Sequence, residues 1–333
     1  MKIIKYLTIF SFFYLLSIEV NATDQSFNQW VNEFKVYAEK KGISTSTLNK
    51  VMNKARYLPK VIKYDRFQPE FYEDTKTYIG KRVTIRKIEK GKLLYNNNSQ
   101  LIKKIEKKFS VEKELLLALM GIETNFGKYL GKMDIVSSLA TLSYDKRRSK
   151  FFTNELLVLL KLIDTNEIDP SVLFGSWAGA FGNFQFMPTT INKYAIDYDS
   201  NSKIELKEIE DSFASAANYI NQIGWNSEEP CYYKVKLKEN IPDKYLNTSA
   251  KKIINKKKAN FFKKYIINYD QLNLKPSMIV AIITPDKSIV DNSNRIYPAY
   301  LVFSNYEIIL KWNRSLRFAL AVCKLKDKFA NEL

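Results

Sequence analysis

The chain has 333 residues, with 53 lysines and arginines against 35 acidic residues, and a formal net charge of +18. It contains no histidine and only two cysteines. A Ser-His-Asp triad, a His-ligated zinc site and a four-cysteine metal cluster within one chain are therefore excluded. Any catalysis must rely on carboxylates, lysine, tyrosine, backbone amides or a hard metal ion.

The N-terminus has the pattern of a secretory signal peptide. Residues 1–22 begin with two lysines, continue with the uncharged run Tyr6–Ile18, and end in a small-residue cleavage pattern at Ala22. The apolar run is short for a bilayer span, which needs about 20 apolar residues. We therefore expect export, with cleavage after Ala22. An exported basic protein is expected to meet an anionic surface and to have no nucleic-acid partner.

The first two-thirds of the chain has helical periodicity. Apolar residues recur at helical spacing from Phe27 to Tyr37, and a new helix is expected after Ser44. A segment over 111–127 is apolar on nearly all sides, which predicts a central buried helix. Other helices are predicted over 96–108, 134–143, 147–163, 188–196 and 209–223.

The pattern changes after about Trp225. Residues 231–238 alternate at period two, and short apolar runs at 277–285 and 299–303 are bounded by turn-forming residues, which favours strands. Helical periodicity returns after Asn305. The sequence therefore predicts an α+β, mainly helical fold. Its predicted parts are a signal peptide over 1–22, an α domain over 23–225, a small β-rich insertion over 226–305 and a C-terminal helix over 306–333.

The two cysteines are 92 positions apart, at Cys231 and Cys323. Export permits a disulfide between them. However, Cys323 lies within an apolar helical pattern, which is typical of a buried free thiol. The sequence therefore favours a free Cys323.

Glu123 is the first candidate for a catalytic residue. It stands near the end of the apolar segment, in Gly-Ile-Glu-Thr-Asn-Phe-Gly. Apolar surroundings make ionisation of a carboxyl costly, so we expect a raised pKa for Glu123, as a general acid at neutral pH requires. The structural alternative is a buried glutamate that pairs with a helix end or an arginine.

Residues 175–188 combine small residues, aromatic rings and uncharged hydrogen-bonding groups. Glycine and alanine allow a bulky ligand to approach the backbone. Aromatic faces, together with Ser176, Asn183 and Gln185, suit sugar rings, which have apolar faces and many hydroxyls. The alternative is a tight glycine-rich connection between two helices.

Residues 197–208 have the spacing of an EF-hand calcium loop. The side-chain ligands and the one backbone carbonyl that this spacing implies belong to Asp197, Asp199, Asn201, Lys203, Glu205 and Glu208. Ser202 occupies the position where glycine normally allows a sharp turn. We therefore expect a structural Ca²⁺ site of reduced affinity. The alternative is a polar turn between helices.

In these motifs the sequence resembles the lytic murein transglycosylase B family. The resemblance rests on Glu-Thr-x-Phe-Gly at 123–127, Leu-Ala-Thr-Leu-Ser at 139–143, Arg147-Arg148, and Gly-Ser-x-Ala-Gly-Ala-x-Gly-x-x-Gln-Phe-Met-Pro at 175–188. Residues 68–71, 78, 217–219 and 312–315 also match. The resemblance covers most of residues 27–325 and includes an EF-hand-like loop.

The resemblance implies a lysozyme-like α domain with a small β domain beside a glycan groove. It implies cleavage of the β-1,4 bond between N-acetylmuramic acid and N-acetylglucosamine in peptidoglycan. The muramyl 6-hydroxyl closes on its own anomeric carbon and leaves a 1,6-anhydro end. This closure needs one carboxyl, acting first as acid and then as base, whereas ordinary glycosidases need two. No cofactor is expected for the reaction.

Carried over by position, the resemblance makes Glu123 the acid and base. The substrate-binding residues that it implies are Tyr78, Arg147, Arg148, Ser176, Gln185, Phe186, Tyr219, Trp312 and Asn313. The sequence departs from the better-known members at Phe151, Trp312 and Phe318, where they carry tyrosine. Stacking is preserved at these positions, but a hydroxyl is lost.

The expected partner is the glycan strand of peptidoglycan, and we expect a monomer. The lipid-attachment cysteine of the membrane-bound members is missing near the N-terminus, so the sequence predicts a soluble periplasmic variant. Two alternatives stay open. One is a hydrolytic muramidase on the same scaffold, with water as the acceptor, and the other is a non-catalytic peptidoglycan-binding protein.

Overall fold

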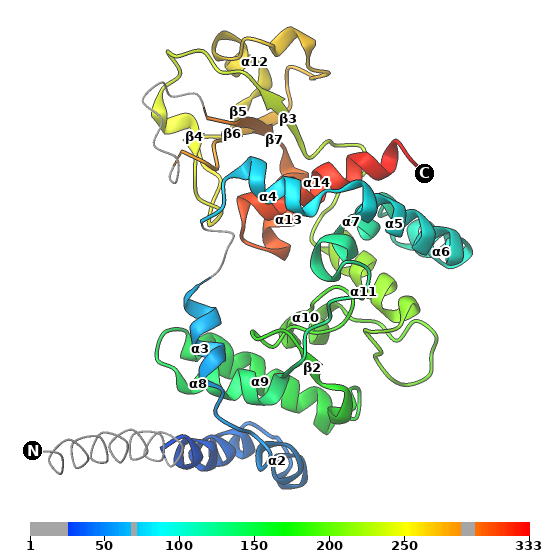
Figure 1. Cartoon of the computed structure of the whole chain (residues 1–333), viewed down its shortest axis with the longest axis vertical. Helices are drawn as coiled ribbons and strands as arrows, with labels where there is room; N and C mark the ends of the chain where they lie inside the picture. Colours follow the sequence, from blue (N-terminus) through cyan, green and yellow to red (C-terminus); the bar gives the residue numbers. More distant parts are fainter. Residues whose placement is uncertain (1–25, 68–71, 288–296) are drawn as a thin grey trace, which may run out of the picture. The chain divides into compact units, whose positions relative to one another are not determined.

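A computed structural model describes residues 26–67, 72–287 and 297–333 (Figure 1). The predicted signal peptide and the motif at 68–71 lie outside the described residues. The described chain is mainly helical with small sheets, as the sequence predicts. None of its helices is both long enough and apolar enough to span a bilayer.

The helices follow the predicted pattern closely in the middle of the chain. Residues 26–40 are helical. The α-helices after them are α2 (Thr45–Met52), α3 (Pro59–Arg66), α4 (Thr75–Arg82), α5 (Ile85–Asn97), α6 (Ser99–Phe109), α7 (Lys113–Thr124), α8 (Ile135–Tyr144), α9 (Ser149–Asp164), α10 (Pro188–Tyr194), α11 (Ile209–Gln222), α12 (Ala259–Phe262), α13 (Ser304–Trp312) and α14 (Leu316–Ala330). Short 3-10 turns are η2 (Pro170–Val172), η3 (Asp243–Tyr245), η4 (Lys263–Tyr265) and η5 (Tyr269–Gln271).

The predicted single C-terminal helix is two helices. The chain leaves helical geometry after α13, and the Ser315 side chain caps α14 by accepting from the Phe318 amide at 3.2 Å. Serine is a favoured N-cap because its oxygen satisfies an amide that has no partner within the helix. The break at 313–315 therefore separates α13 from α14.

The described strands form two sheets. A short antiparallel pair joins β1 (Met133–Asp134) to β2 (Phe174–Gly175). The larger sheet has the order β3-β7-β6-β4, with β5 also paired to β6. Its strands are β3 (Tyr232–Val235), β4 (Leu246–Asn247), β5 (Lys257–Lys258), β6 (Ile279–Ile283) and β7 (Ala299–Val302). The three predicted strand segments are thus found as β3, β6 and β7.

The chain divides into two compact units, along a line that differs from the predicted domain boundaries. One unit contains residues 1–67, 130–193 and 200–204, and the other contains 68–129, 194–199 and 205–333. The β-rich region therefore shares a unit with helices α4–α7, α11, α13 and α14.

A buried ionic cluster helps to explain why the β-rich region belongs with these helices. Arg317 of α14 donates to the Pro285 carbonyl at 2.7 Å and to Asp286 at 2.9 Å, just after β6. Asp286 also accepts from the Thr75 amide and hydroxyl at the start of α4. All three side chains are buried. One carboxylate therefore links the sheet to two helices.

The disulfide is a second link in the same unit, and the prediction of a free Cys323 is wrong. Cys323 on α14 is fully buried, as predicted, but it is bonded to Cys231, which directly precedes β3. The two Cα atoms are 6.0 Å apart, within the usual range for a disulfide. The apolar pattern around Cys323 revealed its burial but not its partner.

The central helix of this unit is α7, as predicted. Every residue from Leu115 to Gly121 is buried. A side chain on Gly121 would come within 2.9 Å of the Phe126 ring and 3.2 Å of Leu325 on α14. Glycine therefore allows α14 to approach the last turns of α7 closely, and this packing supports the end of the helix that carries Glu123.

Candidate active site

Glu123 lies in the last turn of α7 and is half-buried. The helix ends because Asn125 adopts a left-handed conformation, with φ 52°. The Thr124 hydroxyl donates to the Met120 carbonyl at 3.2 Å and accepts from the Gly127 amide at 3.0 Å. These hydrogen bonds fix the backbone at the end of α7, which carries Glu123.

The indole of Trp312 holds one oxygen of Glu123. Its Nε1 donates to Oε1 at 2.9 Å. An indole N–H is a donor only, so it orients the carboxyl without exchanging a proton with it. The structure thus brings together two predicted site residues that are 189 positions apart.

An aromatic stack continues from this contact. The Trp312 ring lies on that of Tyr219 with centroids 5.1 Å apart, and Tyr219 lies on Tyr194 at 4.3 Å. Burial, with a smaller contribution from Tyr194, raises the pKa of Tyr219 to about 12. Tyr219 is therefore a neutral structural support for Trp312 at ordinary pH. Tyr194 is a member of this stack that the sequence did not single out.

A cavity of about 330 Å³ adjoins Glu123, and most of its charged lining is basic. Its described lining residues are Lys81, Thr84, Arg86, Lys87, Lys90, Ile122, Glu123, Asn125 and Tyr129. The four cations of this lining are not among the predicted site residues. The signal was present in the basic run over residues 81–92, where Arg86, Lys87 and Lys90 have the spacing of one helix face.

Lys87 is half-buried, whereas the other three cations are exposed. Burial is the main cause that lowers the pKa of Lys87 to about 8, with smaller contributions from Arg82 and Lys90. A cation that is partly withdrawn from water beside others of the same sign gains by binding an anion. The cavity is therefore suited to an acidic group next to Glu123.

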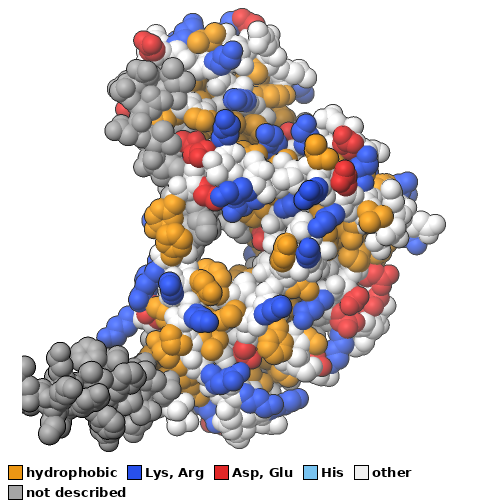
Figure 2. All heavy atoms as spheres, viewed as in Figure 1, with side chains coloured by type: hydrophobic (Ala, Val, Ile, Leu, Met, Phe, Trp, Pro, Cys, Tyr) orange, Lys and Arg blue, Asp and Glu red, His pale blue; other side chains and the backbone are white. Residues whose placement is uncertain are grey.

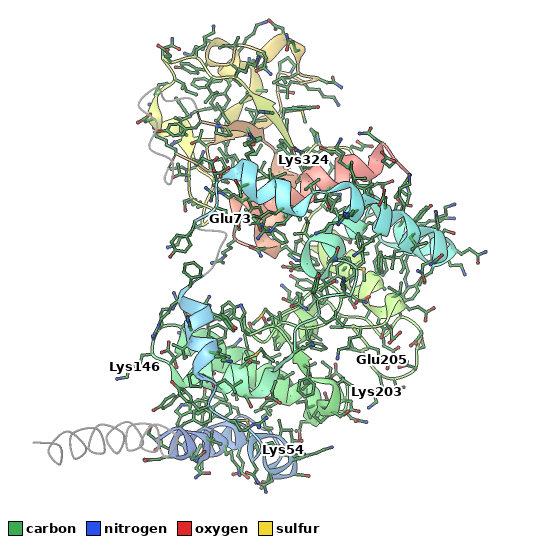
Figure 3. The ribbon with its side chains drawn as sticks, viewed as in Figure 1. Lys54, Glu73, Lys146, Lys203, Glu205 and Lys324 are labelled. Atoms are coloured by element: carbon green, nitrogen blue, oxygen red, sulfur yellow. A yellow bond between two sulfur atoms is a disulfide. The ribbon has the colours of Figure 1, made fainter. Side chains whose placement is uncertain are left out.

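Tyr78 lies on α4 and is buried. The Arg82 guanidinium covers its ring at 3.5 Å from the centroid. Arg82 and Lys81 also pair with Glu73, labelled in Figure 3, and Lys81 is the main cause of the lowered pKa of that carboxyl. Tyr78 is thus a buried residue of α4, the same helix that supplies Lys81 to the basic cavity.

Arg147 and Arg148 belong to the other unit and converge on one carboxylate. Both pair with Asp65 of α3, which is 3% exposed, and Arg147 Nε donates to Asp65 Oδ2 at 2.6 Å. Removing either arginine would leave a buried charge less compensated. This contact ties α3 to the start of α9, a role that the sequence analysis did not foresee.

The glycine-rich segment 175–188 is a tightly hydrogen-bonded loop in the same unit. The Ser176 hydroxyl accepts from the amides of Ala178 and Ala180 at 3.3 and 3.0 Å. Gln185 has φ 52°, and its Nε2 donates to the carbonyls of Leu130 and Gly182. Phe186 is buried. Ser176 and Gln185 remain half-buried on this loop, where each has contacts that fix its position.

The loop that carries Lys203 and Glu205 (Figure 3) lies between α10 and α11. The carboxylates of Asp197, Asp199 and Asp211 converge, with oxygens within 4.8 Å of one another. Asp211 accepts from the amides of Tyr198 and Glu205 at 2.7 and 2.8 Å.

Within the described chain, this acidic group contains Asp211 and neither predicted glutamate. Asp211 stands three residues beyond the expected end of the loop, so the loop spacing does not predict it. Ser202 adopts φ 70°, so serine takes the left-handed turn that usually requires glycine.

Comparisons with known proteins agree with this fold. The family model described as the transglycosylase SLT domain matches residues 26–327. Membrane-bound lytic murein transglycosylase B of Escherichia coli K12 is 34% identical over 149 residues, which are 44% of this chain and 41% of that protein. The alignment thus spans less than half of that relative.

Solved structures are similar over most of the chain. SltB3 of Pseudomonas aeruginosa, in complex with NAG-anhNAM-pentapeptide, has 28% identity and a TM-score of 0.80, covering 91% of this chain and 79% of that one. Escherichia coli lytic transglycosylase Slt35, in complex with calcium, has 23% identity and a TM-score of 0.75, covering 93% and 94%. At this level of identity, the similarity to Slt35 shows only a shared fold. Because the family model matches nearly the whole chain, this protein belongs to the transglycosylase SLT domain family.

Proposed function

We propose that the protein is an exported lytic transglycosylase of peptidoglycan, with Glu123 as its acid and base. The observation that carries the proposal is the half-buried Glu123 carboxyl, held by Trp312 at the end of α7 beside a basic cavity. Family membership and the names of the relatives support the reaction class. The expected product is a glycan end with 1,6-anhydro-N-acetylmuramic acid.

The proposed reaction needs a single carboxyl. Glu123 donates its proton to the glycosidic oxygen as the bond from that oxygen to the muramyl anomeric carbon breaks. The 6-hydroxyl of the same sugar then attacks that carbon and returns a proton to Glu123, so no water is consumed. Trp312 donates to Oε1 and so helps to orient the carboxyl for proton transfer.

The mass of the products tests this proposal against its alternatives. Purified sacculi would be digested with the protein and the muropeptides read by mass spectrometry. Products one water lighter than hydrolysis products are expected. Fully hydrated reducing ends would establish a muramidase instead. Retained binding to sacculi without any product would favour a non-catalytic binding protein.

The proposed groove is defined by the residues that the family resemblance implies. Ser176, Gln185 and Phe186 on the glycine-rich loop, Arg147 and Arg148, and Tyr78, Tyr219, Trp312 and Asn313 are its proposed substrate-binding residues. Residues 226–305 act as an inserted β-rich domain. The proposed setting is the periplasm, with a monomeric enzyme acting on glycan strands, and the basic surface seen in Figure 2 suits an anionic wall polymer.

The basic cavity beside Glu123 is proposed to bind acidic groups of the substrate, and Lys87 provides the test. A lysine with a pKa near 8 carries its charge below that pH and loses it above. The contribution of Lys87 to kcat/KM should therefore fall as pH rises through about 8, because kcat/KM reports the free enzyme. Lys87→Arg should extend activity to higher pH, since guanidinium stays charged.

A matched control separates this effect from a general loss of charge. Lys103 on α6 is exposed and does not line the cavity, so Lys103→Met should leave the pH profile unchanged. Lys87→Met should raise KM for sacculi at pH 7. An unchanged KM and pH profile in both Lys87 variants would remove Lys87 from substrate recognition.

The three converging aspartates are proposed to hold a structural Ca²⁺, with Asn201, Lys203, Glu205 and Glu208 as the other ligands expected from the loop spacing. Carboxylate and carbonyl oxygens are the ligands that Ca²⁺ prefers. At a hundredfold excess over Kd, an ion that binds only the folded state stabilises it by about 2.7 kcal/mol. The ion would support the loop and would take no part in the reaction.

Thermal unfolding checks the calcium proposal. Millimolar Ca²⁺ should raise the Tm of the unaltered protein, and Asp199→Asn should abolish most of that rise. Ser202→Gly should increase it, because glycine relieves the left-handed backbone at φ 70°. Mg²⁺ at equal concentration serves as the control. Identical Tm values with and without Ca²⁺ would contradict a calcium site.

A further inference from the structure

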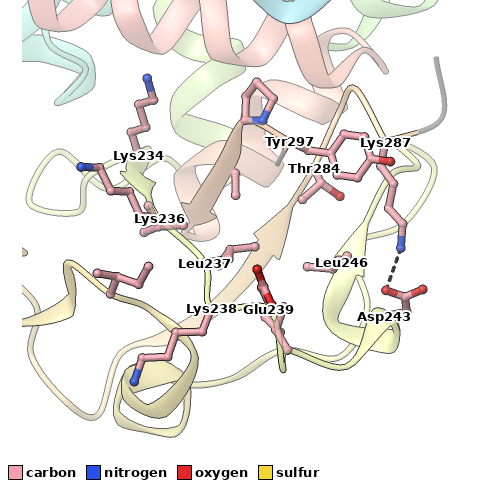
Figure 4. A pocket seen from close by; sticks show the side chains of 15 residues that line it. Lys234, Lys236, Leu237, Lys238, Glu239, Asp243, Leu246, Thr284, Lys287 and Tyr297 are labelled. Carbon is pink, nitrogen blue, oxygen red and sulfur yellow. Dashed lines mark ion pairs between the residues drawn. The ribbon is translucent and has the colours of Figure 1, made fainter. Parts of the chain in front are cut away.

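A cavity of about 650 Å³ lies in the β-rich region (Figure 4). It has the size of a small-molecule site, roughly 300–1,000 Å³. Its described lining comes from β3 and the segment after it, from η3 and β4, and from the ends of β6 and β7. It shares no described lining residue with the basic cavity at Glu123. The active site therefore does not account for this cavity.

Most of the wall is apolar. Val235, Ile241 and Ala299 belong to the buried core of the β-rich region, and their surfaces line the cavity. Leu237 and Leu246 lie toward the middle of the view in Figure 4. Each methylene removed from water here contributes about 0.8 kcal/mol. The wall therefore favours a ligand with a hydrocarbon body.

One end of the wall carries a polar group, the Thr284 hydroxyl. Thr284 lines the cavity and is 1% exposed, and its hydroxyl has no hydrogen-bond partner among the described residues. A buried hydroxyl without a partner costs stability. In the same turn, Lys287 also lines the cavity, and its ammonium lies 3.0 Å from Asp243. This end of the cavity can therefore donate hydrogen bonds to an anion.

The charged lining is mostly basic. Lys234, Lys236 and Lys238 are exposed, and none of their ammonium groups forms an ion pair in the described chain. With Lys287 they outnumber the two acidic residues of the described lining, Glu239 and Asp243. In Figure 4 the ammonium groups of the first three point away from the middle of the view. The methylene chain of a lysine can lie along an apolar wall while its ammonium group attracts an anion from solvent.

We propose that this cavity binds a single-chain anionic amphiphile, namely an alkyl carboxylate. The alkyl chain lies along the apolar wall formed around Leu237 and Leu246. The carboxylate accepts from the Thr284 hydroxyl, with Lys287 beside it. The site is independent of the proposed reaction at Glu123, and its test does not depend on enzyme activity.

Calorimetry with the intact protein and simple alkyl probes tests the site. Decanoate, kept below its micelle concentration, should bind with one-to-one stoichiometry and about 15-fold more tightly than octanoate, because two more methylenes are buried. Decan-1-ol, which has no charge, should bind at least tenfold more weakly than decanoate. No binding of decanoate at millimolar concentration, or equal affinity for octanoate, would overturn the proposal.

Thr284→Val separates a loss of ligand binding from a loss of folding. It removes a buried hydroxyl that has no hydrogen-bond partner in the described part of the chain, so the Tm should hold or rise. Decanoate binding should weaken about tenfold, since a hydrogen bond to a charged group is lost. Thr248→Val is the matched control, because Thr248 is exposed and does not line the cavity. Unchanged affinity in Thr284→Val would overturn the assignment.

Glu239→Gln tests the sign of the ligand's charge. Glu239 is an acidic group in a lining that should attract an anion. Its neutralisation should tighten decanoate binding severalfold, and added salt should reduce that gain. Weaker binding in this variant would point to a cationic or neutral ligand and would contradict the proposal.

Discussion

Glu123→Gln should reduce the release of anhydro-muropeptides from sacculi by about 10²–10⁴-fold, the range that one general acid–base group contributes. Glutamine has nearly the same shape and can still accept from Trp312 Nε1, which lies 2.9 Å from Oε1 in the unaltered protein. It cannot donate a proton to the leaving oxygen at neutral pH. The loss should therefore appear in kcat, with little change in binding to sacculi.

Glu114→Gln on the same helix is the control for this substitution. Glu114 lies in the first turn of α7, where it pairs with Lys113, and it does not line the cavity at Glu123. It should keep nearly full activity. If Glu123→Gln retained activity within a factor of ten, Glu123 would not be the acid and base, and another proton donor would have to be sought.

Replacing both cysteines by alanine should lower the free energy of unfolding by about 4–5 kcal/mol. The disulfide joins residues 92 positions apart, and the chain-entropy model gives this magnitude for a loop of that length. Urea unfolding, monitored by circular dichroism, would measure the loss. A reduced midpoint with an unchanged slope would show that stability, and not compactness, had changed.

Reductant provides an internal control for the disulfide. It should destabilise the unaltered protein to a similar extent and leave the Cys231→Ala, Cys323→Ala double variant unaffected. A double variant as stable as the oxidised protein would mean that the link between α14 and the start of β3 adds nothing to the packing around it. A loss below about 1 kcal/mol would contradict the expectation.

Local patterns predicted the helices well where one face or the whole helix is apolar. Helices α8, α9, α10 and α11 begin and end within two residues of the predicted ranges. α5 was not predicted because its sequence is dominated by basic residues, and Gly91 is its sole buried residue among those described. Helix α5 supplies cations to the cavity at Glu123. This placement depends on the tertiary fold, which the local sequence pattern does not give.

The sequence pointed to individual candidate residues, but it did not predict their contacts. The position of Glu123 follows from one apolar helix, whereas its bond to Trp312 joins segments far apart in the chain. Arg147 and Arg148 were predicted to bind substrate. Both donate to Asp65, which lies some 80 positions earlier in the chain. Asp211 was not predicted as a metal ligand, because the expected loop ended at Glu208. Each of these contacts depends on how distant segments fold together.

The packing of α14 against α7 has a consequence for the order of folding. α14 begins roughly 190 residues after α7 ends, yet it covers the turn at Gly121 that precedes Glu123. Contacts between segments so distant in sequence form late, because closing the intervening loop costs entropy before the contact stabilises anything. The helix that carries the proposed acid therefore stays exposed until α14 has been synthesised and docked. A nascent chain that stops before α14 should expose the apolar surface of α7, and it should be susceptible to proteolysis.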